Sequence, residues 1–130
     1  MSDGKAKILI IDDQPSEVKM VRMALEAAGY EVVHAYNGTE GLEKAGSESP
    51  DLIILDVMMP EKDGFVACAD LKKTPSTASI PVIVLTSIES SSLIFPDAES
   101  ASGSPHADEY IDKPVDPNFL IKRVERLLKK

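Results

Sequence analysis

Polar side chains follow four of the apolar runs in this 130-residue chain, at the points where the runs end. Asp12 and Asp13 follow the first run, Asp56 the third, Thr86 the fourth and Lys113 the fifth. Converging carboxylates repel one another unless a cation lies between them, and hard oxygen ligands favour Mg²⁺. A carboxylate can also act as a nucleophile and form an acyl phosphate. A lysine and a hydroxyl can bind the phosphate oxygens.

Each of these residues has an ordinary structural explanation when it is taken alone. An Asp-Asp pair after a strand is often a helix N-cap with a solvated neighbour. Asp56 could simply end a strand, and Thr86 and Lys113 are residue types common at turns and on surfaces. The combination is much less common. An acid pair, an acid, a hydroxyl and a lysine at successive strand ends together favour a site for metal and phosphate.

The apolar runs predict the strands that would position these side chains. We expect strands at residues 8–11, 31–35, 52–55, 80–85 and 110–111. Three of the runs are continuously apolar and rich in β-branched residues, which suits strands covered on both faces of a parallel sheet. Strands of this kind need crossover connections, which are usually helical.

Helical patterns lie between the strands. Pro15 opens the first helix and Gly29 ends it, Asn37-Gly38 marks a turn before a short second helix, and a third follows Gly64. Asp116-Pro117 forms the N-cap and first position of the last helix. Residues 87–107 show no clean amphipathic pattern, so we expect a short irregular helix or a loop there.

We therefore expect a doubly wound five-stranded parallel α/β sheet, with helices on both faces, in one domain over residues 1–130 with a core at about 6–128. Ligands of such sheets bind beyond the carboxyl ends of the strands. The net charge of −8 argues against direct binding of nucleic acid, and the chain has no apolar run long enough for a membrane span. The single cysteine, Cys68, excludes an internal disulfide and suits a cytoplasmic location.

The strand-end residues and their surroundings resemble the receiver domain of response regulators in two-component signalling. The resemblance covers roughly residues 6–128, and it rests on the stretches 8–13, 51–60, 63–64, 81–86 and 108–114. It implies the strand order 2-1-3-4-5. It also implies that Asp56 accepts a phosphoryl group and that Mg²⁺ is the cofactor, bound directly by Asp13, Asp56 and the backbone carbonyl of Met58. Asp12 would act mainly through a metal-bound water.

The resemblance assigns roles to the later strand ends as well. Lys113 would pair with Asp56 or its phosphate, and Thr86 would bond a phosphate oxygen in the active state. Tyr110 matches an aromatic residue that turns inward when Thr86 moves. Pro114 matches the proline of a peptide bond that is usually cis in the family, and cis bonds are affordable before proline.

The resemblance implies a phosphorylation-controlled switch rather than an enzyme with an external substrate. It would catalyse only its own phosphorylation and dephosphorylation. Its partners would be a histidine kinase or histidine phosphotransfer protein and a downstream protein target. The intact acids argue against a binding module that no longer uses phosphate. Met58 stands where a phosphatase-like enzyme typically has a second aspartate, and residues 12–15 lack the phosphate loop of a flavin carrier.

Some positions depart from the family pattern. Ser87 replaces a usually smaller residue, and His106 stands where the family usually has glycine. Residues 87–107 are unusually polar and correspond to a surface that many receivers use for dimers and partners. A homodimer is therefore left open as an expectation. Met58 and Ile88 cannot orient an attacking water well, so we expect slow self-dephosphorylation.

Overall fold

Five parallel strands form a single sheet in the order β2-β1-β3-β4-β5. The computed structural model describes residues 6–56, 71, 73–86, 108–112 and 115–128. The strands are β1 (Lys7–Ile11), β2 (Glu31–Ala35), β3 (Leu52–Asp56), β4 (Val82–Thr86) and β5 (Glu109–Asp112). The predicted fold class and strand order are confirmed.

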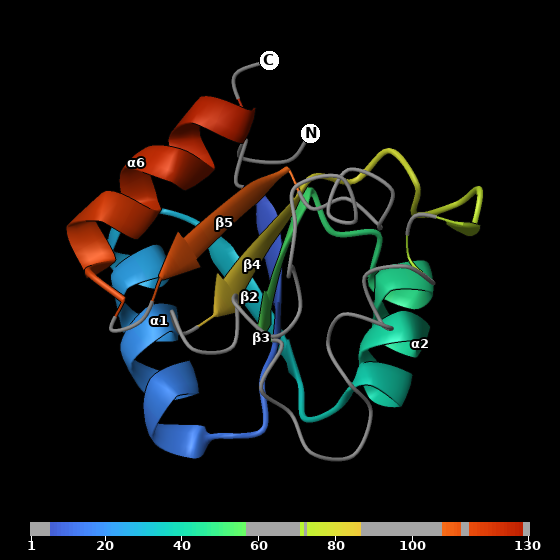
Figure 1. Cartoon of the computed structure of the whole chain (residues 1–130), viewed down its shortest axis with the longest axis horizontal. Helices are drawn as coiled ribbons and strands as arrows, with labels where there is room; N and C mark the ends of the chain where they lie inside the picture. The colour runs from blue at the N-terminus through green and yellow to red at the C-terminus, as the bar shows by residue number, and fades with distance from the viewer. Residues whose placement is uncertain (1–5, 57–70, 72, 87–107, 113–114, 129–130) are drawn as a thin grey trace, which may run out of the picture.

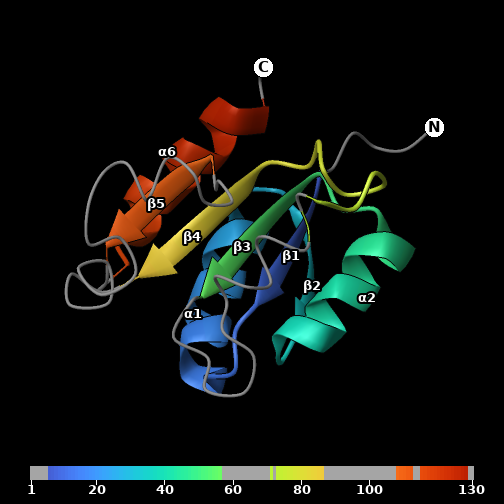
Figure 2. The same cartoon turned by 45° about the vertical axis from the view of Figure 1, so that its right-hand side comes forward.

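Helices cover both faces of the sheet, as Figures 1 and 2 show. The described helices are α1 (Pro15–Ala27), α2 (Gly38–Glu48) and α6 (Pro117–Leu128). Helices α1 and α6 lie side by side on one face, and α2 lies on the other. The two faces enclose separate cores because successive side chains of a strand point to opposite sides. Ile8 and Ile10 belong to the core under α1 and α6, while Leu9 and Ile11 belong to the core under α2.

The first and last helices begin close to where the sequence predicts. Pro15 is the first residue of α1, and Gly29 follows its end with a φ of 97°, a left-handed conformation that favours glycine. Asp116 accepts a hydrogen bond from the backbone N–H of Asn118 at 3.0 Å, which caps α6. The N-cap of α1 is Gln14, and its side chain makes no cap hydrogen bond. Neither member of the Asp12-Asp13 pair is therefore the N-cap of this helix.

Helix α2 packs closely against β1, and its N-cap is a residue that the sequence predicts to lie in a turn. Asn37 is its N-cap and accepts a hydrogen bond from the backbone N–H of Glu40 at 2.9 Å. A Cβ atom at Gly41 would collide with the side chain of Ile11, so glycine allows the helix to pack this near to β1. Ile11 is the residue directly before the acid pair.

The start of β4 differs from the sequence prediction. Strand β4 begins at Val82 rather than at residue 80, because Pro81 has no N–H to donate to a neighbouring strand.

Most of the predicted third helix and all of residues 87–107 lie outside the described residues, although Leu71 is helical and fully buried. Within the described part of the chain, no helix has both the length and the apolar character that crossing a membrane requires.

Candidate metal centre

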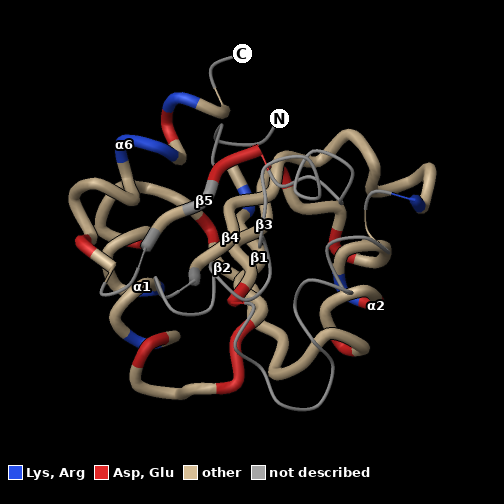
Figure 3. The backbone as a smooth tube through the Cα atoms, in the orientation of Figure 1, with Lys and Arg blue, Asp and Glu red and all other residues tan. Residues whose placement is uncertain are grey.

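Three carboxylates meet at the carboxyl ends of β1 and β3. Asp12, Asp13 and Asp56 each offer an oxygen atom, and these atoms lie within 4.8 Å of one another. The neighbouring register of the two strands brings them together, since Ile11 pairs with Leu55. Asp12 and Asp56 are each only 1% exposed. Figure 3 shows the acidic stretch where β1 leads into α1.

Backbone contacts with β2 and α1 fix the position of Asp12. Its N–H donates to the carbonyl of Ala35 at 3.0 Å, and its Oδ1 accepts from the N–H of Gln14 at 2.9 Å. The Nε2 atom of His34 lies 2.9 Å from the carbonyl oxygen of Asp12. A carbonyl only accepts hydrogen bonds, so Nε2 carries the proton. The turn between β1 and α1 is therefore held from three directions.

The surroundings of Asp12 disfavour its negative charge unless a cation is nearby. Its Oδ2 is buried and accepts no hydrogen bond from the residues that the structure describes. Burial, a hydrogen bond with the carboxyl of Glu17 and the charge of Asp56 raise the pKa of Asp12 to about 9. A divalent cation would offset the repulsion between the carboxylates and would give the Oδ2 atom of Asp12 a positively charged neighbour. The donor set consists of hard oxygens, which Mg²⁺ prefers, so the residues present fit that ion.

Two residues that contact Asp12 have no predicted role in the sequence. Glu17 lies in the first turn of α1 and contacts Asp12, and His34 supports the Asp12 carbonyl from β2. The spacing held a signal for Glu17, because a side chain one turn into a helix can point back toward the strand end that precedes it. For His34, the available signal was the parallel pairing of β1 with β2, which places His34 near the end of β1.

The other predicted site residues are described only in part. Thr86 is the last residue of β4 and pairs in register with Asp112 of β5, and Tyr110 pairs with Val84. The backbone of Thr86 thus ends at the same sheet edge as Asp56. The side chains of Thr86 and Tyr110 lie outside the described part. Met58, Lys113 and Pro114 also lie outside it, so their assigned roles stay predictions.

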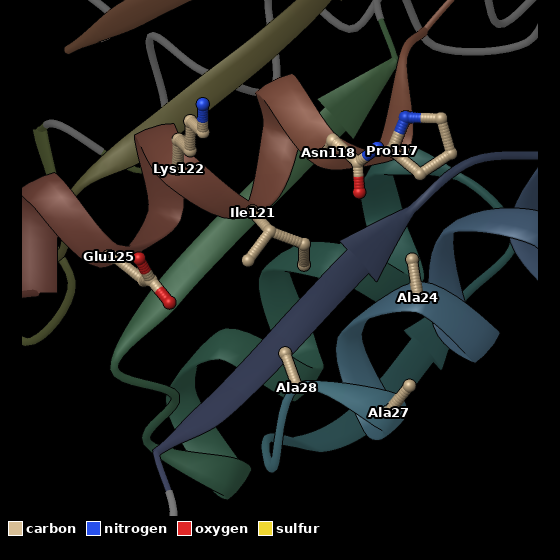
Figure 4. Close-up of a pocket in the computed structure, with 8 residues that line it drawn as sticks. All are labelled: Ala24, Ala27, Ala28, Pro117, Asn118, Ile121, Lys122 and Glu125. Atoms are coloured by element: carbon tan, nitrogen blue, oxygen red, sulfur yellow. The ribbon is translucent and has the colours of Figure 1, made fainter.

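An open groove of about 600 Å³ lies between α1 and α6, and its residues are not those of the carboxylate cluster. Figure 4 shows its lining, which combines small side chains of α1 with longer ones of α6. The lining residues are Ala24, Ala27, Ala28, Pro117, Asn118, Ile121, Lys122 and Glu125. The lining residues include one acid, Glu125, and they form no cluster of acids or nucleophiles like that of Asp12, Asp13 and Asp56.

Comparisons with known proteins agree with this architecture. The family model of the response regulator receiver domain matches residues 8–125. The DNA-binding dual master transcriptional regulator RpaA of Synechocystis is 40% identical over 95% of this chain, which spans 49% of RpaA. Protein PilH of Pseudomonas aeruginosa is 36% identical over 95% of this chain and 98% of its own length.

A solved structure adds a three-dimensional comparison. The response regulator TrrA of Thermotoga maritima, solved in complex with Mg²⁺ and BeF, superimposes with a TM-score of 0.78 at 32% identity and covers 95% of this chain and 99% of its own. The chain spans about half, or less, of several relatives that it matches, RpaA and the response regulator PleD among them. The matched residues, the sheet order and the acid cluster lead to one conclusion: the chain belongs to the family of response regulator receiver domains, which are phosphorylation-controlled switches of two-component signalling.

Proposed function

We propose that Asp56 is the residue that accepts the phosphoryl group, and that this reaction depends on Mg²⁺. The observation that carries the proposal is the cluster of Asp56 with Asp12 and Asp13 at the carboxyl edge of the sheet. Asp56 ends a strand whose five residues are all buried, so its backbone is held rigidly. A rigid nucleophile loses little freedom in the reaction, and positioning of this kind contributes strongly to phosphoryl transfer.

The transfer itself needs little covalent chemistry from the protein. A carboxylate oxygen of Asp56 forms a bond to phosphorus while the bond between phosphorus and the donor breaks. From a phosphohistidine, the leaving imidazole nitrogen keeps the electron pair and takes a proton from solvent. Thr86 and Lys113 would bind the oxygens of the transferred group. In this proposal the chain catalyses only its own phosphorylation and the later hydrolysis of the acyl phosphate.

Four groups would hold the metal ion. Asp13, Asp56 and the backbone carbonyl of Met58 would be direct ligands, and Asp12 would act through a bound water. The ion would supply positive charge against the phosphoryl oxygens. The TrrA complex with Mg²⁺ and BeF supports a Mg²⁺ site in a protein of this fold, because beryllofluoride imitates a phosphoryl group. The raised pKa of Asp12 supports it as well, since burial and neighbouring carboxyls disfavour its charge without a cation.

The partners follow from the chemistry of the donor and the charge of the chain. The donor would be a histidine kinase or a histidine phosphotransfer protein, and the phosphorylated form would bind a downstream protein. Direct binding of DNA by this chain is not proposed, because its net charge of −8 opposes contact with phosphates. RpaA is named as a DNA-binding regulator, and this chain spans only half of that protein.

Intact-mass spectrometry after treatment with acetyl phosphate and Mg²⁺ tests the proposal. We expect the wild-type chain to gain the mass of one phosphoryl group and Asp56→Asn to gain none. Asp51→Asn is the matched control, because it makes the same chemical change at the other end of β3. Labelling of the Asp56→Asn chain to the wild-type extent would refute the assignment of the acceptor.

A further inference from the structure

We propose that Glu17 is a further residue of the cation site, a fourth carboxyl group that raises the affinity for divalent cations by acting through Asp12. This inference deepens the proposed function and rests on the Mg²⁺ site described above. Glu17 lies one turn into α1, and its Oε1 atom is shielded from solvent. Its carboxyl group hydrogen-bonds the carboxyl of Asp12.

The simpler explanation of Glu17 is an ordinary helix-start acid. Acidic residues are favoured in the first turn because the backbone N–H groups there carry partial positive charge. An acid with only that role gains by staying in solvent, where its charge is hydrated. Glu17 is instead half-buried and turned to another carboxyl group, which a helix-start role does not require. Contact between two carboxyl groups is favourable only when a proton or a cation shares their charge, and a divalent cation can take the place of the proton.

A second observation points to a ligand at this spot. Asp12 is 1% exposed, and its Oδ2 accepts no hydrogen bond from the described residues. Its other oxygen is taken up by the N–H of Gln14 at 2.9 Å. The same carboxyl group belongs to the cluster with Asp13 and Asp56, whose oxygen atoms lie within 4.8 Å of one another. A cation there would lie near three carboxylates directly and near Glu17 through Asp12.

Added negative charge at short range should be visible in affinity. Unit charges a few ångströms apart interact strongly when the effective dielectric constant is about 20, as near a protein surface. We therefore expect Glu17→Gln to weaken Mg²⁺ and Mn²⁺ binding roughly tenfold. High salt should reduce this effect only partly, because buried pairs are screened less than exposed ones.

The matched control is Glu26→Gln, which removes the same charge from the same helix. Glu26 is exposed and pairs with Arg22 at 3.2 Å, away from the carboxylate cluster. A general effect of net charge would lower the affinity equally in both variants. An effect through Asp12 would appear in Glu17→Gln alone. Glu17→Met, a residue of similar length with good helix propensity, provides a second test should the amide variant fail to fold.

Isothermal titration with Mg²⁺, and electron paramagnetic resonance with Mn²⁺, measure the affinities of the unphosphorylated protein directly. A Glu17 variant that binds at least about threefold more weakly than Glu26→Gln supports the proposal, because the predicted loss is roughly tenfold. A smaller difference overturns it while leaving the metal site intact. Absence of any cation binding by the wild-type chain would instead overturn the Mg²⁺ site. Phosphoryl labelling at Asp56 is a separate measurement, so the two failures are distinguishable.

Discussion

The two edges of the sheet use aspartate in opposite ways. At the amino edge, Asp51 accepts a hydrogen bond from the N–H of Lys7 at 2.7 Å, and Asp108 accepts one from the N–H of Val82 at 2.8 Å. Both side chains connect neighbouring strands and belong to exposed residues. At the carboxyl edge, Asp12 and Asp56 are buried beside each other. The aspartates of the amino edge accept backbone hydrogen bonds between strands, whereas Asp12 at the carboxyl edge uses one oxygen for a backbone donor and keeps the other for the proposed ligand.

This difference separates aspartates that stabilise the sheet from aspartates that form the candidate metal site. A carboxylate that accepts a backbone N–H completes the pairing of the sheet, so its charge stabilises the fold. A carboxylate buried next to others destabilises the metal-free fold. Sites that act on ligands commonly retain such unfavourable arrangements, because activity requires them. Mg²⁺ should therefore raise the free energy of unfolding through the carboxylates of the carboxyl edge. The contacts of the amino edge should contribute equally with and without Mg²⁺.

The largest expected effect is a pH dependence that Mg²⁺ removes. The pKa of Asp12 is raised from 3.8 to about 9 in the folded, metal-free protein. Well below pH 3.8 both the folded and the unfolded chains hold this proton, so Asp12 has no net effect on stability there. As the pH rises toward 9, only the unfolded chain loses the proton, and the free energy of unfolding falls.

Urea unfolding at several pH values, with chelator or with Mg²⁺, measures this dependence. For one proton the slope is at most about 1.4 kcal/mol per pH unit. The difference between wild type and Asp12→Asn isolates Asp12 from the other titrating groups. We expect this difference to grow with pH in chelator and to be small with saturating Mg²⁺. A difference that is constant across the pH range would show that Asp12 does not titrate as described.

A second expected effect is that one substitution has opposite signs at the two edges. In chelator at pH 8, Asp12→Asn should stabilise the protein by about 1–3 kcal/mol, because the buried Asp12 carboxyl must take up a proton on folding at this pH and an asparagine need not. Asp51→Asn should destabilise it by about 0.5–1 kcal/mol, because the hydrogen bond from Lys7 loses its charge assistance. Thermal and urea unfolding of both variants compare the signs. Destabilisation by both would contradict the distinction between the edges.

The smallest expected effect concerns an ion pair at the amino edge. Lys7 Nζ lies 3.2 Å from Glu48 Oε1, and both side chains are partly exposed to solvent. Exposed pairs contribute little, so Glu48→Gln should cost about 0.5 kcal/mol or less and leave Mg²⁺ affinity unchanged. Calorimetry of unfolding, with and without Mg²⁺, checks both parts. A large loss of Mg²⁺ affinity would mean that the two edges are coupled through the sheet.

The central part of the fold could be predicted because its strands carry a strong signal. The runs at β1 and β3 are continuously apolar, as buried parallel strands require, and parallel strands place their carboxyl ends at one edge. The convergence of Asp12, Asp13 and Asp56 follows from that topology together with the register of β1 and β3. Sequence was enough for this part because backbone geometry alone brings the residues together.

The supporting contacts could not be predicted in the same way. The approach of Glu17 to Asp12 depends on how α1 packs after β1, which the spacing alone does not specify. The contact of His34 with the Asp12 carbonyl depends on which ring nitrogen carries the proton and where the ring points. The sequence predicts a turn at Asn37, but the same side chain suits a turn and a helix N-cap equally well, and in the structure it caps α2. Such contacts are decided by side-chain rotamers.

Strand β1 is hydrogen-bonded on both sides, to β2 and to β3, and Ile8, Leu9, Ile10 and Ile11 are almost completely buried. Amide hydrogens of such a strand exchange with solvent only when the whole domain opens, whereas fraying reaches the ends of a chain first. The strand end that carries Asp12 should then stay in place until the domain unfolds globally. The geometry on which the proposed chemistry depends would thus persist unbroken through many local fluctuations of the surrounding surface.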